Sequence, residues 1–405
     1  MRIPTLLDRR RPTPTPTRKR GRSRPARKLL ASLASVMLAS WAAQSLADAS
    51  PSLGPLPDPS ARLLGADDAS EYWTLYIELE SGHRITQRFL LTNAGPGKQT
   101  AVAVGHLLEP GRAPYRYVNG RRRSRWTLSK DRLFFDIAAS HLDLHRPRGE
   151  LRITKDDIEI RLFFDFATSD LAAPVPRNRL PSGYRVDVLA VAAATQGSIH
   201  APWMAAPIQT VGRTWMVHTW SEKSESKLLD RRIDLYGGDG ESAFYGLQLR
   251  NGNRFSSHWV LGRSREGKII ESPINISETW TESSREASLR GSRSYPLPGD
   301  FRVVGPKSGL ITLNQEWLRF DPLEVIPNPF RWFIRRSTRP QEVWADTRID
   351  VTLLLAPNAP SPPNRPGANE STITSSSERG TESGSAVGSM AGVASVTFMN
   401  PIDRR

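Results

Sequence analysis

The chain contains no cysteine. Disulfide bonds, thiol catalysis and cysteine metal sites are therefore excluded, and the fold has to be held by its apolar cores. The sequence also lacks a Gly-x-Ser-x-Gly motif, a Walker loop and a dinucleotide fingerprint in a strand-turn-helix context. These absences argue against the standard hydrolase, kinase and dehydrogenase functions.

Long apolar runs are scarce, and one of them lies near the start of the chain. Residues 29–43 carry no charge, and Ser45, Leu46 and Ala47 follow as a small-x-small cleavage signal. A basic segment precedes the run. This order predicts a signal peptide with a basic leader over residues 1–47, cleaved near Ala47, and an exported protein that is periplasmic or secreted. An uncleaved membrane anchor is the alternative.

The net charge of +15 belongs mostly to the leader. Residues 1–47 contain eleven Lys and Arg residues and one acidic residue, whereas the rest of the chain has 45 basic and 40 acidic residues. Nucleic-acid binding needs a concentrated basic surface, which so small an excess does not supply. We therefore expect no nucleic-acid partner.

Alternating apolar and polar residues dominate the chain from residue 71 to about 355. In residues 158–166, Ile158, Ile160, Leu162 and Phe164 share one face, and polar residues take most of the other. Residues 72–80 alternate in the same way. Side chains of a strand alternate between its faces, so these segments are expected to be strands with one buried and one wet face. The pattern is typical of antiparallel barrels and sandwiches.

Turn signals divide the strands into two series, each with enough strands for a barrel of about eight. We expect an all-β protein with two consecutive antiparallel lipocalin-like β-barrels, short helices and disordered termini. After the leader, the predicted parts are a linker over 48–70, an N-terminal barrel over 71–200, a C-terminal barrel over 201–356, and a disordered Pro/Ser/Gly-rich tail over 357–405. The second series is expected to start at residues 214–220. Val396, Phe398 and Met399 either dock or belong to a frayed terminus, and we favour the terminus.

Residues around the junction of the two series resemble the fungal survival-factor family. Their order, which is similar to that between the two barrels of the family, is Gly197, Ser198, His200, Trp203, Gly212 and then residues 215–220 around His218. Residues 317–354 are similar to its closing segment. The resemblance implies tandem lipocalin-like barrels, a fold shared with carotenoid hydratases, tocopherol cyclases and AttH-type secreted proteins. Lipophilic ligands are common to these relatives, but their activities differ.

The function we expect is that of an exported tandem-lipocalin protein that binds or carries a lipophilic ligand, such as a lipid or an isoprenoid. One alternative is a hydratase or cyclase that protonates an isoprenoid double bond in a barrel cavity. Another is a non-catalytic protein of the cell envelope. Binding is favoured over catalysis because no arrangement of catalytic residues is readable, and the catalytic residues stay unknown. No cofactor is expected.

Five residues are candidates for ligand binding: His200, Trp203, His218, Trp220 and Tyr245. Alternation places His218 on the same strand face as Met216 and Trp220. A histidine among aromatic side chains can protonate an alkene or orient a polar head group. The alternative, which we favour, is a hydrogen-bonded interface histidine, because no titrating partner is fixed by the spacing.

Residues 327–336 interrupt the β pattern with a predicted short amphipathic helix. Its candidate residues are Phe330, Arg331, Trp332, Phe333, Arg335 and Arg336. They would either cap a barrel end, which we favour, or bind an anionic membrane surface. No metal site is expected, since His141 and His145 lack a third ligand and the acidic residues near Gly240 are irregularly spaced.

Overall fold

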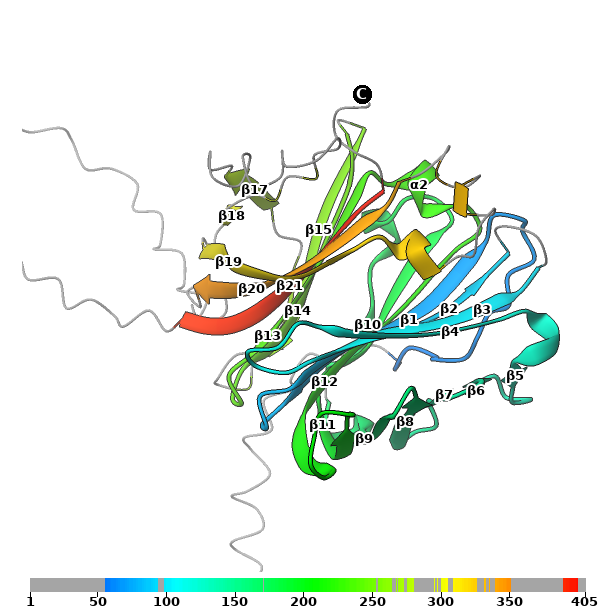
Figure 1. Cartoon of the computed structure of the whole chain (residues 1–405). Coiled ribbons are helices and arrows are strands. Elements are labelled where there is room, and N and C mark those ends of the chain that lie inside the picture. The colour runs from blue at the N-terminus through cyan, green and yellow to red at the C-terminus, as the bar shows by residue number, and fades with distance from the viewer. Residues whose placement is uncertain are drawn as a thin grey trace, which may run out of the picture. The chain divides into compact units, whose positions relative to one another are not determined.

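The structure is a computed structural model. The residues it describes are 55–93, 98–169, 171–252, 254–263, 267, 269–272, 275–279, 295, 297, 300–304, 309–325, 331–332, 335, 339–350 and 389–399. They form two antiparallel sheets and a few short helical turns (Figure 1). The predicted all-β class is confirmed.

The first sheet has twelve strands, which are ordered β4-β3-β2-β1-β12-β11-β9-β8-β7-β6-β5, with β10 paired to β11. Their bounds are β1 (Ser70–Leu79), β2 (Arg84–Thr92), β3 (Thr100–Leu108), β4 (Tyr115–Arg121), β5 (Thr127–Leu128), β6 (Phe134–Ile137), β7 (Ser140–Asp143), β8 (Arg148–Lys155), β9 (Ile158–Asp165), β10 (Ala173–Pro174), β11 (Tyr184–His200) and β12 (Ile208–Ser221). The sheet curls so that its two ends approach each other: Asn119 on β4 donates from Nδ2 to the hydroxyl of Ser140 on β7 at 2.7 Å.

The second sheet has nine strands in the order β16-β15-β14-β13-β21-β20-β19-β18-β17. Their bounds are β13 (Arg231–Gly238), β14 (Ala243–Asn251), β15 (Phe255–Arg263), β16 (Ile269–Ser272), β17 (Asn275–Thr279), β18 (Asp300–Val304), β19 (Gly309–Phe320), β20 (Gln341–Asp350) and β21 (Ser389–Phe398). The helical turns are η1 (Arg123–Arg125), η2 (Phe166–Thr168), η3 (Arg177–Arg179), α2 (Glu225–Leu228) and η4 (Pro322–Val325). Among the described residues, no helix is both long and apolar enough to cross a membrane.

Each face of the first sheet packs against a different core. The inner face, which carries Trp73, Leu75 and Met216, packs against apolar side chains of β6 to β9, because the sheet curls back on itself. The outer face carries Tyr76 and Trp215 and packs against the second sheet. The Tyr76 ring, for example, lies 5.3 Å from the ring of Tyr236 on β13.

The alternation in β9 was read correctly. Ile158, Ile160, Leu162 and Phe164 are buried on the inner face, while Glu159 and Arg161 are exposed. In β1 the predicted wet face is wrong, because Tyr72, Thr74 and Tyr76 are also buried. The second sheet covers that face, so a polar-looking alternation became a strand buried on both sides.

Strand β12 corrects the predicted start of the second barrel. Residues 214–220 were expected to open the second series, but β12 pairs with β1 and β11 in the first sheet. The second sheet begins at β13. The signal in residues 214–220 was a genuine strand signal, but alternation does not say which neighbours a strand takes.

Part of the predicted disordered tail is a strand, so that prediction was wrong for residues 389–398. Strand β21, red in Figure 1, lies between β13 and β20 and pairs with both. Val396, Phe398 and Met399 are buried. The favoured frayed terminus is therefore replaced by the docking alternative. Residues 357–388 and 400–405 lie outside the described residues.

Candidate functional site

His218 lies on β12 at the centre of a row of side chains on the inner face of the first sheet. The strand registers place Trp73 of β1 and Asp187 of β11 directly opposite it, one on each side. Directly opposed residues of antiparallel strands project from the same face, with Cβ atoms about 5 Å apart. Three strands thus bring an imidazole, an indole and a carboxyl together.

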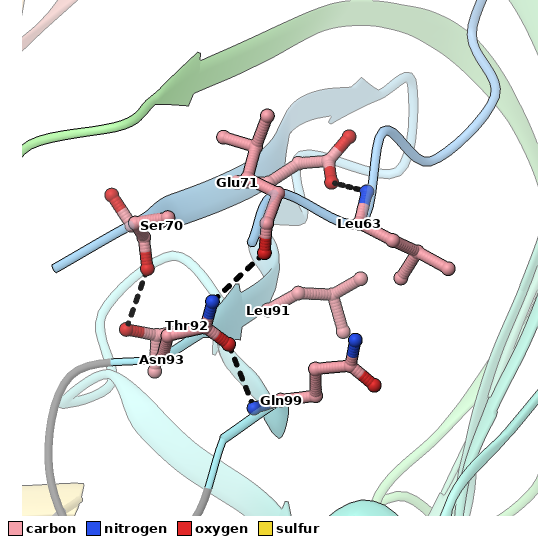
Figure 2. A pocket seen from close by; sticks show the side chains of 9 residues that line it. Leu63, Ser70, Glu71, Leu91, Thr92, Asn93 and Gln99 are labelled. Carbon is pink, nitrogen blue, oxygen red and sulfur yellow. Dashed lines mark hydrogen bonds between the residues drawn. The ribbon is translucent and has the colours of Figure 1, made fainter. Parts of the chain in front are cut away.

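A carboxyl group holds His218 in one orientation. Nε2 of His218 lies 2.8 Å from Oε1 of Glu71, and both side chains are buried. Glu71 also accepts the backbone N–H groups of Arg62 at 2.7 Å and Leu63 at 3.1 Å, the latter drawn in Figure 2. Since the Glu71 oxygens act as acceptors, Nε2 carries the proton and Nδ1 is left with a lone pair. Nδ1 is buried and has no hydrogen-bond partner among the residues that the structure describes.

Two tryptophans enclose the imidazole. The Trp73 ring stacks on it with a centroid distance of 4.3 Å and an interplanar angle of 12°, and the Trp220 ring lies at 4.7 Å. Burial lowers the pKa of His218, although the hydrogen bond to Glu71 opposes that shift. The imidazole is therefore neutral at pH 7, and its Nδ1 can accept a hydrogen bond or a proton.

Asp187 adds a carboxyl that titrates near neutrality. Burial raises its pKa to about 6, with Asp58 contributing in the same direction and Arg62 and Arg185 opposing. Its side chain is 8% exposed. Close to neutral pH such a carboxyl is present both as an acid and as a base, which suits it to donate or accept a proton beside His218.

Residues 58–63, here called the strap, cover these side chains. Nε1 of Trp73 donates to the carbonyl of Pro59 at 3.1 Å, and the Arg62 guanidinium lies 5.0 Å from the centre of the Trp220 ring. Ala61 is buried, and its N–H donates to the carbonyl of Arg132. The predicted linker over 48–70 is therefore wrong for the strap, which packs onto the sheet because its backbone groups find acceptors and donors there.

A cavity of about 10 Å³ opens beside Glu71, lined among others by Leu63, Leu91, Asn93 and Gln99 (Figure 2). It has room for one water molecule at most. His218 does not line this cavity and is fully buried, so a larger molecule can reach it only after residues that cover it move.

Tyr245, another predicted ligand residue, belongs to a separate buried cluster between the sheets. Its hydroxyl donates to Oδ1 of Asp234 at 2.6 Å, and Asp234 also pairs with the Arg232 guanidinium through two 2.7 Å bonds. The remaining Arg232 nitrogen, Nη1, donates to the hydroxyls of Tyr72 and Tyr184 at 2.8 Å. All three guanidinium nitrogens are bonded, so this inter-sheet network joins the two sheets.

The other candidates are dispersed. His200 ends β11 opposite Glu159, away from His218. Trp203 contacts the Tyr115 ring at 5.3 Å and donates from Nε1 to Glu109. Of the five predicted ligand residues, the structure brings only His218 and Trp220 together.

The predicted cap is described in part. Arg331, Trp332 and Arg335 are helical, and Trp332 is 52% exposed. Arg335 forms an ion pair with Asp321, and Arg331 donates to the carbonyl of Glu324 at 2.8 Å. Phe330, Phe333 and Arg336 lie outside the described residues. The choice between a barrel cap and a membrane contact stays open.

The remaining site residues are harder to predict from the sequence. Trp73 was placed on an apolar strand face, but Glu71 and Asp187 were not recognised, because their proximity to His218 depends on pairing between distant strands. Within the described part of the chain, no group of three or more His, Asp or Glu side chains is placed to hold a metal ion.

The fold is similar to those of solved structures. An AttH-type protein from Nitrosomonas europaea matches with a TM-score of 0.52 and 14% identity over 85% of this chain and 97% of that one. Kievitone hydratase from Nectria haematococca matches with a TM-score of 0.52 and 10% identity, covering 87% and 95% of the two chains. CghA, solved with Sch210972, gives 0.51 and 11%, covering 87% and 97%. No family model and no curated protein matches the sequence. At these identities the similarity establishes a shared lipocalin-like fold with AttH-type and hydratase structures.

Proposed function

We propose that this protein binds a small hydrophobic molecule that carries a polar group, on the inner face of the first sheet at His218. The observation that carries the proposal is the free Nδ1 of His218, buried between two tryptophan rings. Buried polar atoms normally have hydrogen-bond partners. A ligand that donates a hydrogen bond to Nδ1 and lies against the indole rings would satisfy both features of the site.

The strap provides a route for such a ligand. The contacts that hold it are the bond from Trp73 to the Pro59 carbonyl, the two N–H bonds to Glu71, the cation-π contact of Arg62 and the bond from Ala61 to the Arg132 carbonyl. A moving strap would expose Trp220, which is already partly exposed, and then His218. The structure of CghA with Sch210972 shows that a protein of this fold has been solved with a ligand, which supports ligand binding rather than any particular route.

Binding can be tested with four probes: dodecanol, dodecanoic acid, farnesol and retinol. Native mass spectrometry of the purified protein should reveal a co-purified molecule or a 1:1 complex with at least one probe. Trp220→Ala should weaken that complex about tenfold, since loss of an aromatic contact surface costs about 1–2 kcal/mol. The control is Val211→Ala, which shortens a side chain that is 45% exposed and should leave affinity unchanged. If no probe binds and no molecule co-purifies, the proposal is refuted.

A second candidate function is acid-base catalysis of the hydratase or cyclase type, which Asp187 favours. With a pKa of about 6, Asp187 can donate a proton to one carbon of a double bond. Nδ1 of His218 can then take a proton from the water whose oxygen adds to the other carbon. Return of that proton from His218 to Asp187 restores both groups, so that the net reaction is addition of one water. Mass spectrometry of farnesol incubated with the protein in ¹⁸O-water would show a labelled hydrate. The product should disappear in Asp187→Asn, and a wild-type protein that makes none refutes catalysis on this probe class.

We also propose export, supported by the basic leader, the charge-free run at residues 29–43 and the signal before Asp48. N-terminal sequencing of the protein from a bacterial expression host should find a mature chain that begins at Asp48. A chain that keeps its leader and stays in the cytoplasm would contradict export.

A further inference from the structure

A second group of buried polar atoms lies on the inner face of the first sheet, in the row next to His218. The strand registers align Gln87 of β2, Gly105 of β3 and Tyr117 of β4 side by side. Gln87 and Tyr117 are each 1% exposed. Both belong to the wall of the same core as Trp73 and Met216, because Gln87 also lies opposite Leu75 of β1.

The polar ends of Gln87 and Tyr117 converge over Gly105. A Cβ atom at residue 105 would lie 2.4 Å from Oε1 of Gln87 and 2.5 Å from the hydroxyl of Tyr117. Any side chain at this position would therefore collide with both atoms. Because residue 105 has no side chain, the amide oxygen of Gln87 and the phenol of Tyr117 can occupy the space above β3.

Neither atom has a hydrogen-bond partner among the described residues, although one is an acceptor and the other a donor. The amide orientation is fixed, because Nε2 of Gln87 donates to the carbonyl of Arg88 at 3.1 Å, so Oε1 is the atom that faces Tyr117. Burial raises the pKa of Tyr117, which keeps the phenol protonated and able to donate. An acceptor and a donor thus lie close together, each without a partner, in an apolar interior where unsatisfied polar atoms are costly.

We propose that Gln87 and Tyr117 form a subsite for the hydroxyl group of a hydrophobic alcohol. The ligand oxygen accepts from the Tyr117 hydroxyl, and the ligand O–H donates to Oε1 of Gln87. An alcohol matches this pair because its oxygen both donates and accepts, whereas an ether, a ketone or a carboxylate cannot donate. The inference rests on the proposed function and adds a second polar group to the ligand, because the hydroxyl bound by Gln87 and Tyr117 is a different group from the one that donates to Nδ1 of His218.

The subsite lies next to a seam in the sheet. Tyr117 is on β4, which ends the strand order of the first sheet, and the other end is β5. Asn119, two residues further along β4, crosses to Ser140 by a side-chain bond. A ligand that passes between β4 and β7 breaks side-chain contacts and leaves the backbone hydrogen bonds of the sheet in place.

The test compares each alcohol probe with its methyl ether, dodecanol with dodecyl methyl ether and farnesol with farnesyl methyl ether. An ether can accept from Tyr117 but cannot donate to Gln87, so wild type should bind the alcohol about tenfold more tightly. Gln87→Met should abolish this preference, because the acceptor is gone while the volume is nearly kept. Tyr117→Phe should weaken binding of alcohol and ether alike, by about tenfold.

Tyr115→Phe is the matched control, since it makes the same chemical change two residues earlier on β4 and should leave both affinities unchanged. In the ligand-free protein, Tyr117→Phe should keep or raise the melting temperature, because it removes a buried hydroxyl without a partner. A fall in melting temperature with unchanged probe binding would identify a structural water site and overturn the proposal. Equal binding of alcohol and ether by wild type, or a preference that survives in Gln87→Met, would also overturn it. If neither alcohol nor ether binds, the proposed function itself fails.

Discussion

Phe398 gives the sharpest test of the unexpected last strand. It ends β21, lies opposite Arg231 of β13 and Gln341 of β20, and is 1% exposed. Its ring centre is 5.6 Å from that of Tyr295. Replacing a buried phenylalanine by alanine costs about 3–5 kcal/mol, because apolar contacts are lost and a cavity remains. Phe398 is at the end of its strand, so we expect Phe398→Ala to lower the free energy of unfolding by about 3 kcal/mol.

Urea denaturation followed by tryptophan fluorescence measures this change. A loss of that size is a large share of the 5–15 kcal/mol of total stability that is typical of proteins, so the midpoint should shift clearly. Leu56→Ala is the control, since Leu56 is 59% exposed and its replacement should change stability by less than about 0.5 kcal/mol. If Phe398→Ala also stays within about 0.5 kcal/mol of wild type, β21 does not pack as described and the disordered tail is restored.

Three further predictions concern buried and partly buried charges. Burial gives Asp187 a folded pKa of about 6 against 3.8 in the unfolded chain, so the folded state holds the proton more tightly and stability falls as the pH rises from about 4 to about 6. Asp187→Asn should abolish that fall and raise the free energy of unfolding at pH 8 by about 1–3 kcal/mol, as measured by urea titration. Arg232→Met should lower the free energy of unfolding by about 3–5 kcal/mol, because it leaves Asp234 buried without its cation. The double variant with Asp234→Leu should recover part of this loss, and additive losses would contradict the pairing. Arg335→Gln should change stability by less than about 1 kcal/mol, since its ion pair with Asp321 is partly exposed, and salt-sensitive loss of anionic liposome binding in this variant would favour the membrane alternative.

The strands were the most predictable part of the molecule. In β9 the alternation of Ile158, Ile160 and Leu162 with charged residues matches the observed burial, because that strand has one apolar neighbour layer and one wet face. In β1 the alternation was present but misleading. Tyr72 and Tyr76 look polar beside Trp73, yet their rings pack against the second sheet and only their hydroxyls need partners.

The site was predictable only within one strand. His218 and Trp220 were grouped because they are two residues apart, which places them on one face. Glu71 is 147 residues from His218, and the two meet because β12 pairs with β1. A single residue of slip in that pairing would turn Glu71 and Trp73 to the opposite face, so the site depends on a register that local pattern does not contain.

Strand β21 escaped prediction because of its composition. It contains Ser389, Ala391, Gly392 and Ser395, small residues that continue the Ser/Gly-rich segment before it. The structure supplies a reason at Gly392, where a Cβ atom would lie 2.7 Å from the carbonyl oxygen of Tyr236 and 2.8 Å from the hydroxyl of Thr347. A strand that lies between two others has neighbouring atoms close to it on both sides. At such a position glycine fits because it has no side chain, although its strand propensity is low.

The two buried polar arrangements differ in a way that bears on function. Every guanidinium nitrogen of Arg232 donates a hydrogen bond, to Asp234, Tyr72, Tyr184 or Thr219. A buried arginine that joins two sheets requires such complete pairing. His218 is held just as firmly by Glu71, yet its second nitrogen is left without a partner in the described structure. Stability alone would be served better by an apolar side chain at that position, since a half-satisfied buried polar group is costlier than an apolar one. Local rules of this kind fail mainly where a site serves a ligand or a reaction, so the unsatisfied nitrogen supports the proposal that a ligand binds on the inner face of the first sheet.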